Sequence, residues 1–164
     1  MRKKSDLSLR ARALQCLACR EYSRAELHAK LLPHAHAGKG FDQVVESSGM
    51  VNLDVLLDDL VSRGWLSDER AVNQLVHAKR SRFGSLRIMR ELRLRGIDES
   101  LLGDVLPELK ESDLEAAQAV WQRKFGKYPQ DAKEKARQMR FLQSRGFSTD
   151  TIFKIMANTD FAEE

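Results

Sequence analysis

Apolar residues recur at helical spacing along most of the chain. Leu53, Leu56, Leu57, Leu60 and Val61 follow the i, i+3, i+4, i+7, i+8 pattern of an amphipathic helix. Similar stripes occur within residues 13–18, 72–76, 114–125 and 152–156. Helices this short are marginal when isolated, so their apolar stripes must pack against one another. The pattern predicts an all-α fold.

A motif of Leu, Arg, Gly and a large apolar residue punctuates these stripes three times. It occurs as Leu60-x-x-Arg63-Gly64-Trp65, Leu92-x-x-Arg95-Gly96-Ile97 and Leu142-x-x-Arg145-Gly146-Phe147. A left-handed Gly after the last helical turn, followed by an apolar residue that contacts the Leu, is the Schellman ending of a helix. Ser67, Asp98 and Ser148 follow and can cap the next helix. The motif therefore predicts a helix, a sharp turn and a second helix, three times.

Counting helices around these turns predicts three tandem three-helix, helix-turn-helix-like repeats that form an elongated, curved body. We expect the repeats at 8–66, 67–106 and 107–157, with flexible ends at 1–7 and 158–164. Two connections are irregular. The segment from Pro33 to Met50 is predicted to be a long loop, and the acidic, Pro107-containing stretch from Gly103 to Asp113 is predicted to be a polar joint.

Composition narrows the class of protein. The 164 residues are 42% hydrophobic and 32% charged, with only 7% aromatic residues, which favours helices in a soluble chain. No apolar run approaches the roughly 20 residues of a membrane helix, and no secretory signal is recognised. Two cysteines without an export signal indicate a reducing compartment. We expect a cytoplasmic protein.

The net charge of +4 is distributed unevenly. Lys79 to Arg95 holds seven basic residues and one acidic residue, whereas the remainder is slightly acidic. On a helix running from a Ser85 cap to Arg95, the side chains of Arg87, Arg90 and Arg93 oppose an apolar arc of Ile88, Met89 and Leu92. Such a basic field favours an anionic partner such as nucleic acid.

A second basic row lies on the long helix before Arg145. Lys133, Arg137 and Arg140 are spaced i, i+4, i+7 and share one face. The alternative interpretation is that each row is an ordinary solvated face. Two rows on corresponding helices of successive repeats favour a binding surface, to which Arg80 and Arg82 also belong.

No pattern of catalytic or metal-binding residues emerges. Cys16-x-x-Cys19 precedes His34 and His36, but the histidines lie two residues apart, unlike the usual zinc spacing, so small core thiols are favoured. Gly38-Lys39-Gly40 lacks the remaining elements of a phosphate-binding loop. We therefore expect no enzyme activity, no cofactor and no metal.

The aromatic residues are assigned to packing. Five of them lie on apolar stripes or at Schellman positions, which favours the core over base stacking: Trp65, Trp121, Phe125, Phe147 and Phe153. Tyr22 and Phe83 each precede a helix start, where a hydrophobic staple explains them.

Four longer motifs stand out along the chain. They are Tyr22-Ser23-x-x-Glu26-Leu27-x-x-Lys30-Leu31, Leu60-x-x-Arg63-Gly64-Trp65-Leu66-Ser67-Asp68-Glu69-Arg70, Arg80-x-Arg82-Phe83-Gly84-x-x-Arg87-Ile88-x-x-Glu91-Leu92-x-x-Arg95-Gly96-Ile97 and Arg140-Phe141-Leu142-x-x-Arg145-Gly146-Phe147. In combination they resemble the RecX family, bacterial regulators of the RecA recombinase, from about Arg10 to Ala157. Ser85 stands where the family commonly has proline, and both residues suit a helix start.

The resemblance implies three tandem three-helix repeats. It also implies binding in the groove of a RecA filament on single-stranded DNA and inhibition of the recombinase, ATPase and repressor-cleaving activities. We expect a monomer that contacts single-stranded DNA weakly or through RecA, and no membrane partner. The expected contact residues are Arg80, Arg82, Arg87, Arg90, Arg93, Lys133, Arg137 and Arg140.

The alternative function is that of a sequence-specific helix-turn-helix DNA-binding regulator. Sharp glycine turns and an arginine-rich helix fit that class. A reader of base edges usually shows Asn, Gln or Ser among its arginines, however, and residues 87–95 have none.

Overall fold

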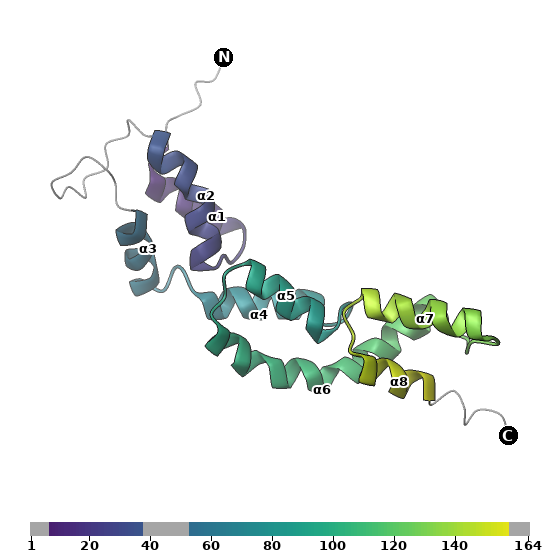
Figure 1. Cartoon of the computed structure of the whole chain (residues 1–164). Helices are drawn as coiled ribbons and strands as arrows, with labels where there is room; N and C mark the ends of the chain where they lie inside the picture. The colour runs from purple at the N-terminus through teal and green to yellow at the C-terminus, as the bar shows by residue number, and fades with distance from the viewer. Residues whose placement is uncertain (1–6, 38–52, 158–164) are drawn as a thin grey trace, which may run out of the picture. The chain divides into compact units, whose positions relative to one another are not determined.

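The computed structural model describes residues 7–37 and 53–157, and within them the chain is helical without a strand (Figure 1). The all-α prediction is confirmed. The helices are α1 (Leu9–Cys19), α2 (Arg24–Ala37), α3 (Leu53–Ser62), α4 (Asp68–Lys79), α5 (Ser85–Leu94), α6 (Glu99–Lys124), α7 (Ala132–Ser144) and α8 (Thr149–Ala157). None of the described helices is long and apolar enough to cross a membrane. Residues 38–50 of the predicted loop, and residues 1–6 and 158–164 of the two ends predicted to be flexible, lie outside the described residues.

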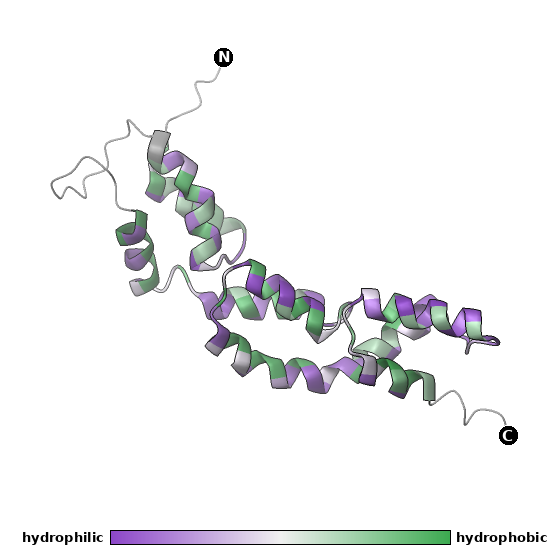
Figure 2. Ribbon diagram, in the orientation of Figure 1, coloured by the Kyte–Doolittle hydropathy of each residue, from purple (hydrophilic) through white to green (hydrophobic). Residues whose placement is uncertain are grey.

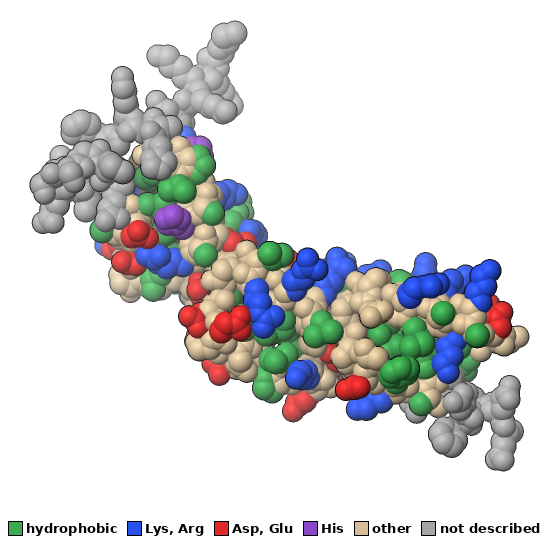
Figure 3. Space-filling model, in the orientation of Figure 1, with side chains coloured by type: hydrophobic (Ala, Val, Ile, Leu, Met, Phe, Trp, Pro, Cys, Tyr) green, Lys and Arg blue, Asp and Glu red, His purple; other side chains and the backbone are tan. Residues whose placement is uncertain are grey.

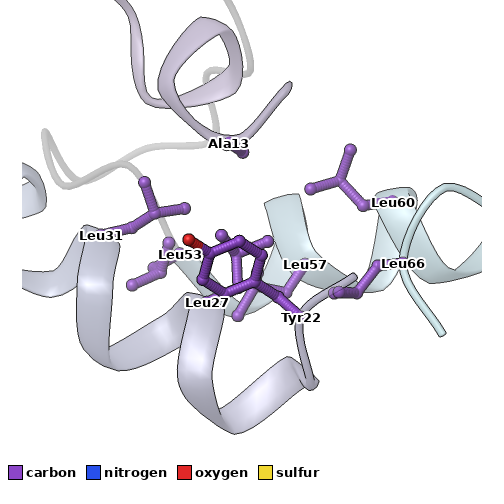
Figure 4. Close-up of a cluster of buried hydrophobic side chains, with 8 residues drawn as sticks. All are labelled: Ala13, Tyr22, Leu27, Leu31, Leu53, Leu57, Leu60 and Leu66. Carbon is purple, nitrogen blue, oxygen red and sulfur yellow. The ribbon is translucent and has the colours of Figure 1, made fainter. Parts of the chain in front are cut away.

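The chain forms two compact units, Met1–Val72 and Asn73–Glu164. In the first, α1, α2 and α3 enclose a core whose side chains converge in Figure 4: Ala13, Tyr22, Leu27, Leu31, Leu53, Leu57, Leu60 and Leu66. Helix α2 begins with a capping box, because Glu26 accepts from the backbone N–H of Ser23 at 3.0 Å and Ser23 Oγ accepts from that of Glu26 at 3.1 Å. The backbone N–H of Arg24 donates to Asp68 at 2.7 Å and ties α2 to the start of α4.

The second unit contains α5 to α8, and both hydrophobic and hydrophilic residues occur along these helices in Figure 2. One hydrophobic cluster of this unit lies between α6, α7 and α8 and comprises Ala117, Val120, Trp121, Leu142, Phe147, Ile152, Ile155 and Met156. Trp121 Nε1 donates to buried Gln138 at 2.7 Å, and Gln138 donates to the carbonyl oxygen of Lys127 at 3.2 Å. These bonds hold the loop between α6 and α7 against α7.

The three predicted turns are confirmed. Gly64, Gly96 and Gly146 have φ values of 71°, 71° and 88°. In each turn the residue after the Gly donates its N–H to the carbonyl of the motif's Leu, at 2.9, 3.2 and 3.3 Å. Ser67, Asp98 and Ser148 each accept an N–H from the following helix, as expected.

The first predicted connection begins later than expected, and the second is wrong. Helix α2 continues through Pro33 to Ala37, so the loop does not begin at Pro33, and Gly103 to Asp113 lies inside α6. A proline in a helix removes the bond to the carbonyl four residues earlier. For Pro33 that residue is Ala29, and for Pro107 it is Gly103. Both are exposed, so water can donate a hydrogen bond to the free carbonyl.

The segment from Gly103 to Asp113 is acidic, but its buried residues continue the apolar side of α6 without a break. Leu102, Leu109 and Ala117 are buried along α6, and Asp113 occupies the stripe between the last two. The second and third predicted repeats are therefore joined by a helix, not by a polar joint. The boundary between them at 106/107 stays a prediction.

Candidate functional site

The N-terminus of α5, which carries the predicted arginine row, is anchored by a buried carboxylate. Asp113 on α6 accepts from the backbone N–H of Ser85 at 2.8 Å and from the Ser85 hydroxyl at 2.5 Å. The N-cap is Gly84, so the prediction that Ser85 caps α5 is wrong. Burial raises the pKa of Asp113, although the two bonds from Ser85 act to lower it.

The same helix end also rests on the turn that closes α7. The backbone N–H of Gly84 donates to the carbonyl oxygen of Arg145 at 2.9 Å, and that of Leu86 donates to Gly146 at 3.1 Å. A Cβ on Gly84 would overlap the Gly146 carbonyl, and one on Gly146 would overlap Arg87 Cβ, both at less than 3.0 Å. The two glycines therefore permit a backbone contact that fixes α5 against the end of α7.

The predicted arrangement of α5 is confirmed. Ile88, Met89 and Leu92 are buried, whereas Arg87, Arg90 and Arg93 are exposed. Arg87 leans toward the glycine contact, where its Nη1 donates to the carbonyl oxygen of Ser144 at 3.1 Å. Its guanidinium lies 4.4 Å from the centroid of the Phe83 ring.

Part of the basic segment is neutralised locally. Glu91 accepts from Lys79 at 2.7 Å and from Arg95 at 3.0 Å. Burial acts to raise the pKa of Glu91, but the bonds from these two cations outweigh it and lower the pKa.

Two of the eight predicted contact residues also have carboxylate partners, both on α6. Arg80 pairs with Glu108 at 3.2 Å and Arg93 with Glu99 at 2.9 Å. These pairs are exposed, and exposed pairs are weak enough for a stronger anionic partner to replace them.

The second predicted row is exposed on α7. Lys133, Arg137 and Arg140 all face solvent, and Arg137 lies 5.8 Å from the Phe125 ring centroid. Together with Arg82, Arg87 and Arg90, they form no ion pair with any carboxylate in the described part of the chain. Basic side chains gather over α5 and α7 in Figure 3. We call the six residues the basic surface.

Arg145, the C-cap of α7, is not among the predicted contact residues, yet it lies beside the start of α5. Its guanidinium lies 5.3 Å from the Phe83 ring centroid and 5.2 Å from that of Phe141. The local motif identifies Arg145 only as a favourable charge at a helix end. Its contact with Phe83, 62 positions away, cannot be found from a local pattern.

Several packing assignments need correction. Trp121 and Phe147 are buried as expected, but Trp65 is 45% exposed and Phe153 is 53% exposed. In the first turn, Leu66 occupies the core in place of Trp65, which lies between Arg10 and Arg63. Cys16 packs against the first core, as predicted for a core thiol. Cys19 is exposed, so the prediction is wrong for this residue.

No group of three or more His, Cys, Asp or Glu side chains within residues 7–37 and 53–157 is arranged to hold a metal ion. Gly38-Lys39-Gly40 lies outside that part of the chain. The charged side chains that do cluster in the described residues are the cations of the basic surface, over α5 and α7.

The fold and the basic surface define a class, that of all-helical proteins built from small three-helix modules that expose arginines on fixed helices. Family models for "RecX, second three-helix domain" and "RecX, third three-helix domain" match residues 67–106 and 111–156. The chain belongs to the RecX family.

Relatives match over nearly the whole length. The chain is 44% identical to the regulatory protein RecX of Leptothrix cholodnii over 154 residues, covering 94% of this chain and 90% of the relative. It is 42% identical to that of Ralstonia nicotianae, with 94% and 89% covered. The crystal structure of RecX from Lactobacillus salivarius has the same fold, with a TM-score of 0.72 at 18% identity over 93% of this chain and 94% of that one.

Proposed function

We propose that this protein binds RecA filaments on single-stranded DNA and inhibits their recombinase, ATPase and coprotease activities. It acts by occupying the filament as a cytoplasmic monomer and catalyses no reaction itself. Membership of a family of proteins named regulatory protein RecX supports this function. The contact residues are the eight predicted ones, and the basic surface makes the largest contribution.

The observation that carries this proposal is the fixed pair of basic helices. Six exposed cations have no carboxylate partner among the described residues, and the contacts at Gly84 and Gly146 hold α5 against the end of α7. We expect a filament groove to expose DNA phosphates together with protein carboxylates. Arginines that are positioned before binding lose less conformational freedom when they form charge-assisted bonds to such groups.

The test reverses two of these charges. In R87E/R90E, repulsion replaces attraction, and the concentration that halves RecA ATPase on single-stranded DNA should rise at least about tenfold. Circular dichroism should show unchanged helicity, since both side chains are exposed and R87E removes only the bond to the Ser144 carbonyl and the contact with Phe83, while the backbone bonds of Gly84 and Leu86 remain. Inhibition equal to that of the wild type would overturn the assignment.

A matched control separates location from net charge. Arg123 and Lys154 are exposed cations on α6 and α8 without hydrogen-bond or ion-pair partners in the described structure. R123E/K154E changes the net charge by the same amount and should leave inhibition within about twofold of the wild type. Equal losses in both double variants would mean that net charge, not the basic surface, governs binding.

The helix-turn-helix alternative predicts tight, sequence-dependent binding to bare duplex DNA. The exposed side of α5 carries arginines and leucines but no Asn or Gln to read base edges. Binding to random duplex fragments and to RecA-coated single strands should be compared at equal salt. Preference for one duplex sequence over the filament would favour the alternative.

A further inference from the structure

Helix α5 carries two leucines that are not used in packing. Leu94 is 80% exposed and Leu86 is 57% exposed, the highest values for large hydrophobic side chains in the described residues. Since Ile88, Met89 and Leu92 already cover the inner side of α5, neither leucine is needed for the core. Both leucines lie on the same ten-residue helix.

The leucines alternate with the arginines around the helix. Successive residues are about 100° apart, so Arg93, Leu86, Arg90, Leu94 and Arg87 follow one another within an arc of about 120°. Hydrophobic and basic side chains lie side by side over α5 in Figure 3. The arc is therefore a mixed apolar and cationic face.

The exposed face of α7 differs. Lys133, Arg137, Arg140 and Ser144 lie within an arc of about 60°, and no large hydrophobic side chain is exposed on α7. One helix of the basic surface thus offers charge alone, and the other offers charge with apolar contacts.

These faces suit different chemistry. Phosphates attract cations but provide no pocket for a leucine, and single-stranded bases are held chiefly by aromatic stacking, for which the exposed arc of α5 has no ring. A protein surface with carboxylates around an apolar depression complements both residue types of α5.

We propose that α5 docks on a protein surface through Leu86 and Leu94, with its arginines on surrounding carboxylates, while the α7 row contacts DNA phosphates. This inference rests on the proposed function, in which the protein surface belongs to RecA. The helices divide recognition of the filament between its two components.

The first arm of the test uses the full chain with L86S/L94S, which retains every charge. Binding to RecA filaments on single-stranded DNA should weaken at least about tenfold, because two apolar contacts are lost. Binding to the same DNA without RecA, measured at low salt, should stay within about twofold of the wild type. The control V55S/F153S also removes exposed apolar side chains, from α3 and α8, and should bind filaments as the wild type does.

The second arm uses K133Q/R137Q/R140Q. It should weaken binding to bare single-stranded DNA and reduce the slope of log affinity against log salt by about 2, the value for three phosphate contacts. A wild-type chain without affinity for bare single strands at low salt would overturn the phosphate assignment of α7.

The outcomes distinguish the two proposals. If the wild type does not bind RecA filaments, the proposed function fails and this inference fails with it. If the wild type binds and L86S/L94S binds equally well, only the inference fails. An equal loss of L86S/L94S binding to bare DNA and to filaments would place α5 on the DNA and would also overturn it.

Discussion

The backbone N–H of Gly84 donates to the carbonyl oxygen of Arg145 at 2.9 Å, so the cap of α5 is bonded to the turn that ends α7. This bond joins residues 61 positions apart through main-chain atoms alone. The first turn of a helix has N–H groups without intrahelical partners, and the last turn has free carbonyls. Here the carbonyl groups at the end of α7 accept hydrogen bonds from N–H groups at the start of α5.

Substituting Gly84 should break this contact. The methyl group that alanine adds would overlap the Gly146 backbone, so G84A should lower the free energy of unfolding by about 2 to 4 kcal/mol through overpacking and lost hydrogen bonds. Urea denaturation followed by circular dichroism measures the change. G103A is the control, because nothing lies within 4 Å of its new Cβ and alanine favours the interior of α6 by about 0.5 to 1 kcal/mol. A G84A variant as stable as the wild type would show that the close approach is not required.

Asp113 should make stability decrease with rising pH. Its folded pKa lies above the ordinary 3.8, so between the two pKa values the native state keeps a proton that the unfolded chain releases. The contribution is complete below pH 3.8 and is lost as the pH rises through the folded pKa. D113N removes this titration, so its stability deficit relative to the wild type should be larger near pH ~4 than near pH ~7.5. A deficit that grows with pH would contradict the assignment.

Glu91 should have the opposite dependence. Its folded pKa lies below the ordinary 4.5, so its contribution is present above pH 4.5 and is lost as the pH falls through the folded pKa. E91Q should cost about 1 kcal/mol at about pH 7, given partly exposed ion pairs. Urea midpoints measured across the acid range should converge for E91Q and the wild type. A constant gap between them would mean that Glu91 acts through packing and not through its charge.

The buried pair of Trp121 and Gln138 can be tested by a double-mutant cycle. Q138L leaves the indole N–H of Trp121 without its acceptor and should cost about 1 to 3 kcal/mol. W121F removes the donor, so adding Q138L to it should cost less than Q138L does alone. Unfolding free energies of the four proteins give the coupling energy, and a value near zero would show that the bond is not stabilising.

Local patterns predict the turns, the capping residues after them and the sides of α5 correctly, because each depends on residues a few positions apart. The arginine rows are located for the same reason. The ion pair of Arg80 with Glu108 and the ring contacts of Arg145 join distant positions, and no periodicity indicates them. Only the packed helices bring these residues together.

Predictions fail where the polarity of a residue does not match its burial, or where a proline lies inside a helix. Asp113 is polar but buried, which conceals the continuity of α6, whereas Trp65 is apolar but exposed beside two arginines. Pro33 and Pro107 predict breaks, yet each lies four residues after an exposed position whose carbonyl solvent can reach. In each case the tertiary environment overrides the usual preference.

The continuity of α6 restricts changes in chain length. Asp113 must reach Ser85 on α5, and Trp121 must reach Gln138 on α7, from the same helix. One residue inserted between them would rotate the two side chains apart by about 100° and separate them by about a further 1.5 Å. An insertion of about seven residues would nearly restore their angular relation but would move them about 10 Å apart along the axis. The number of residues from Asp113 to Trp121 is therefore fixed by the contacts at its two ends. This stretch of the chain should tolerate substitutions far better than insertions or deletions.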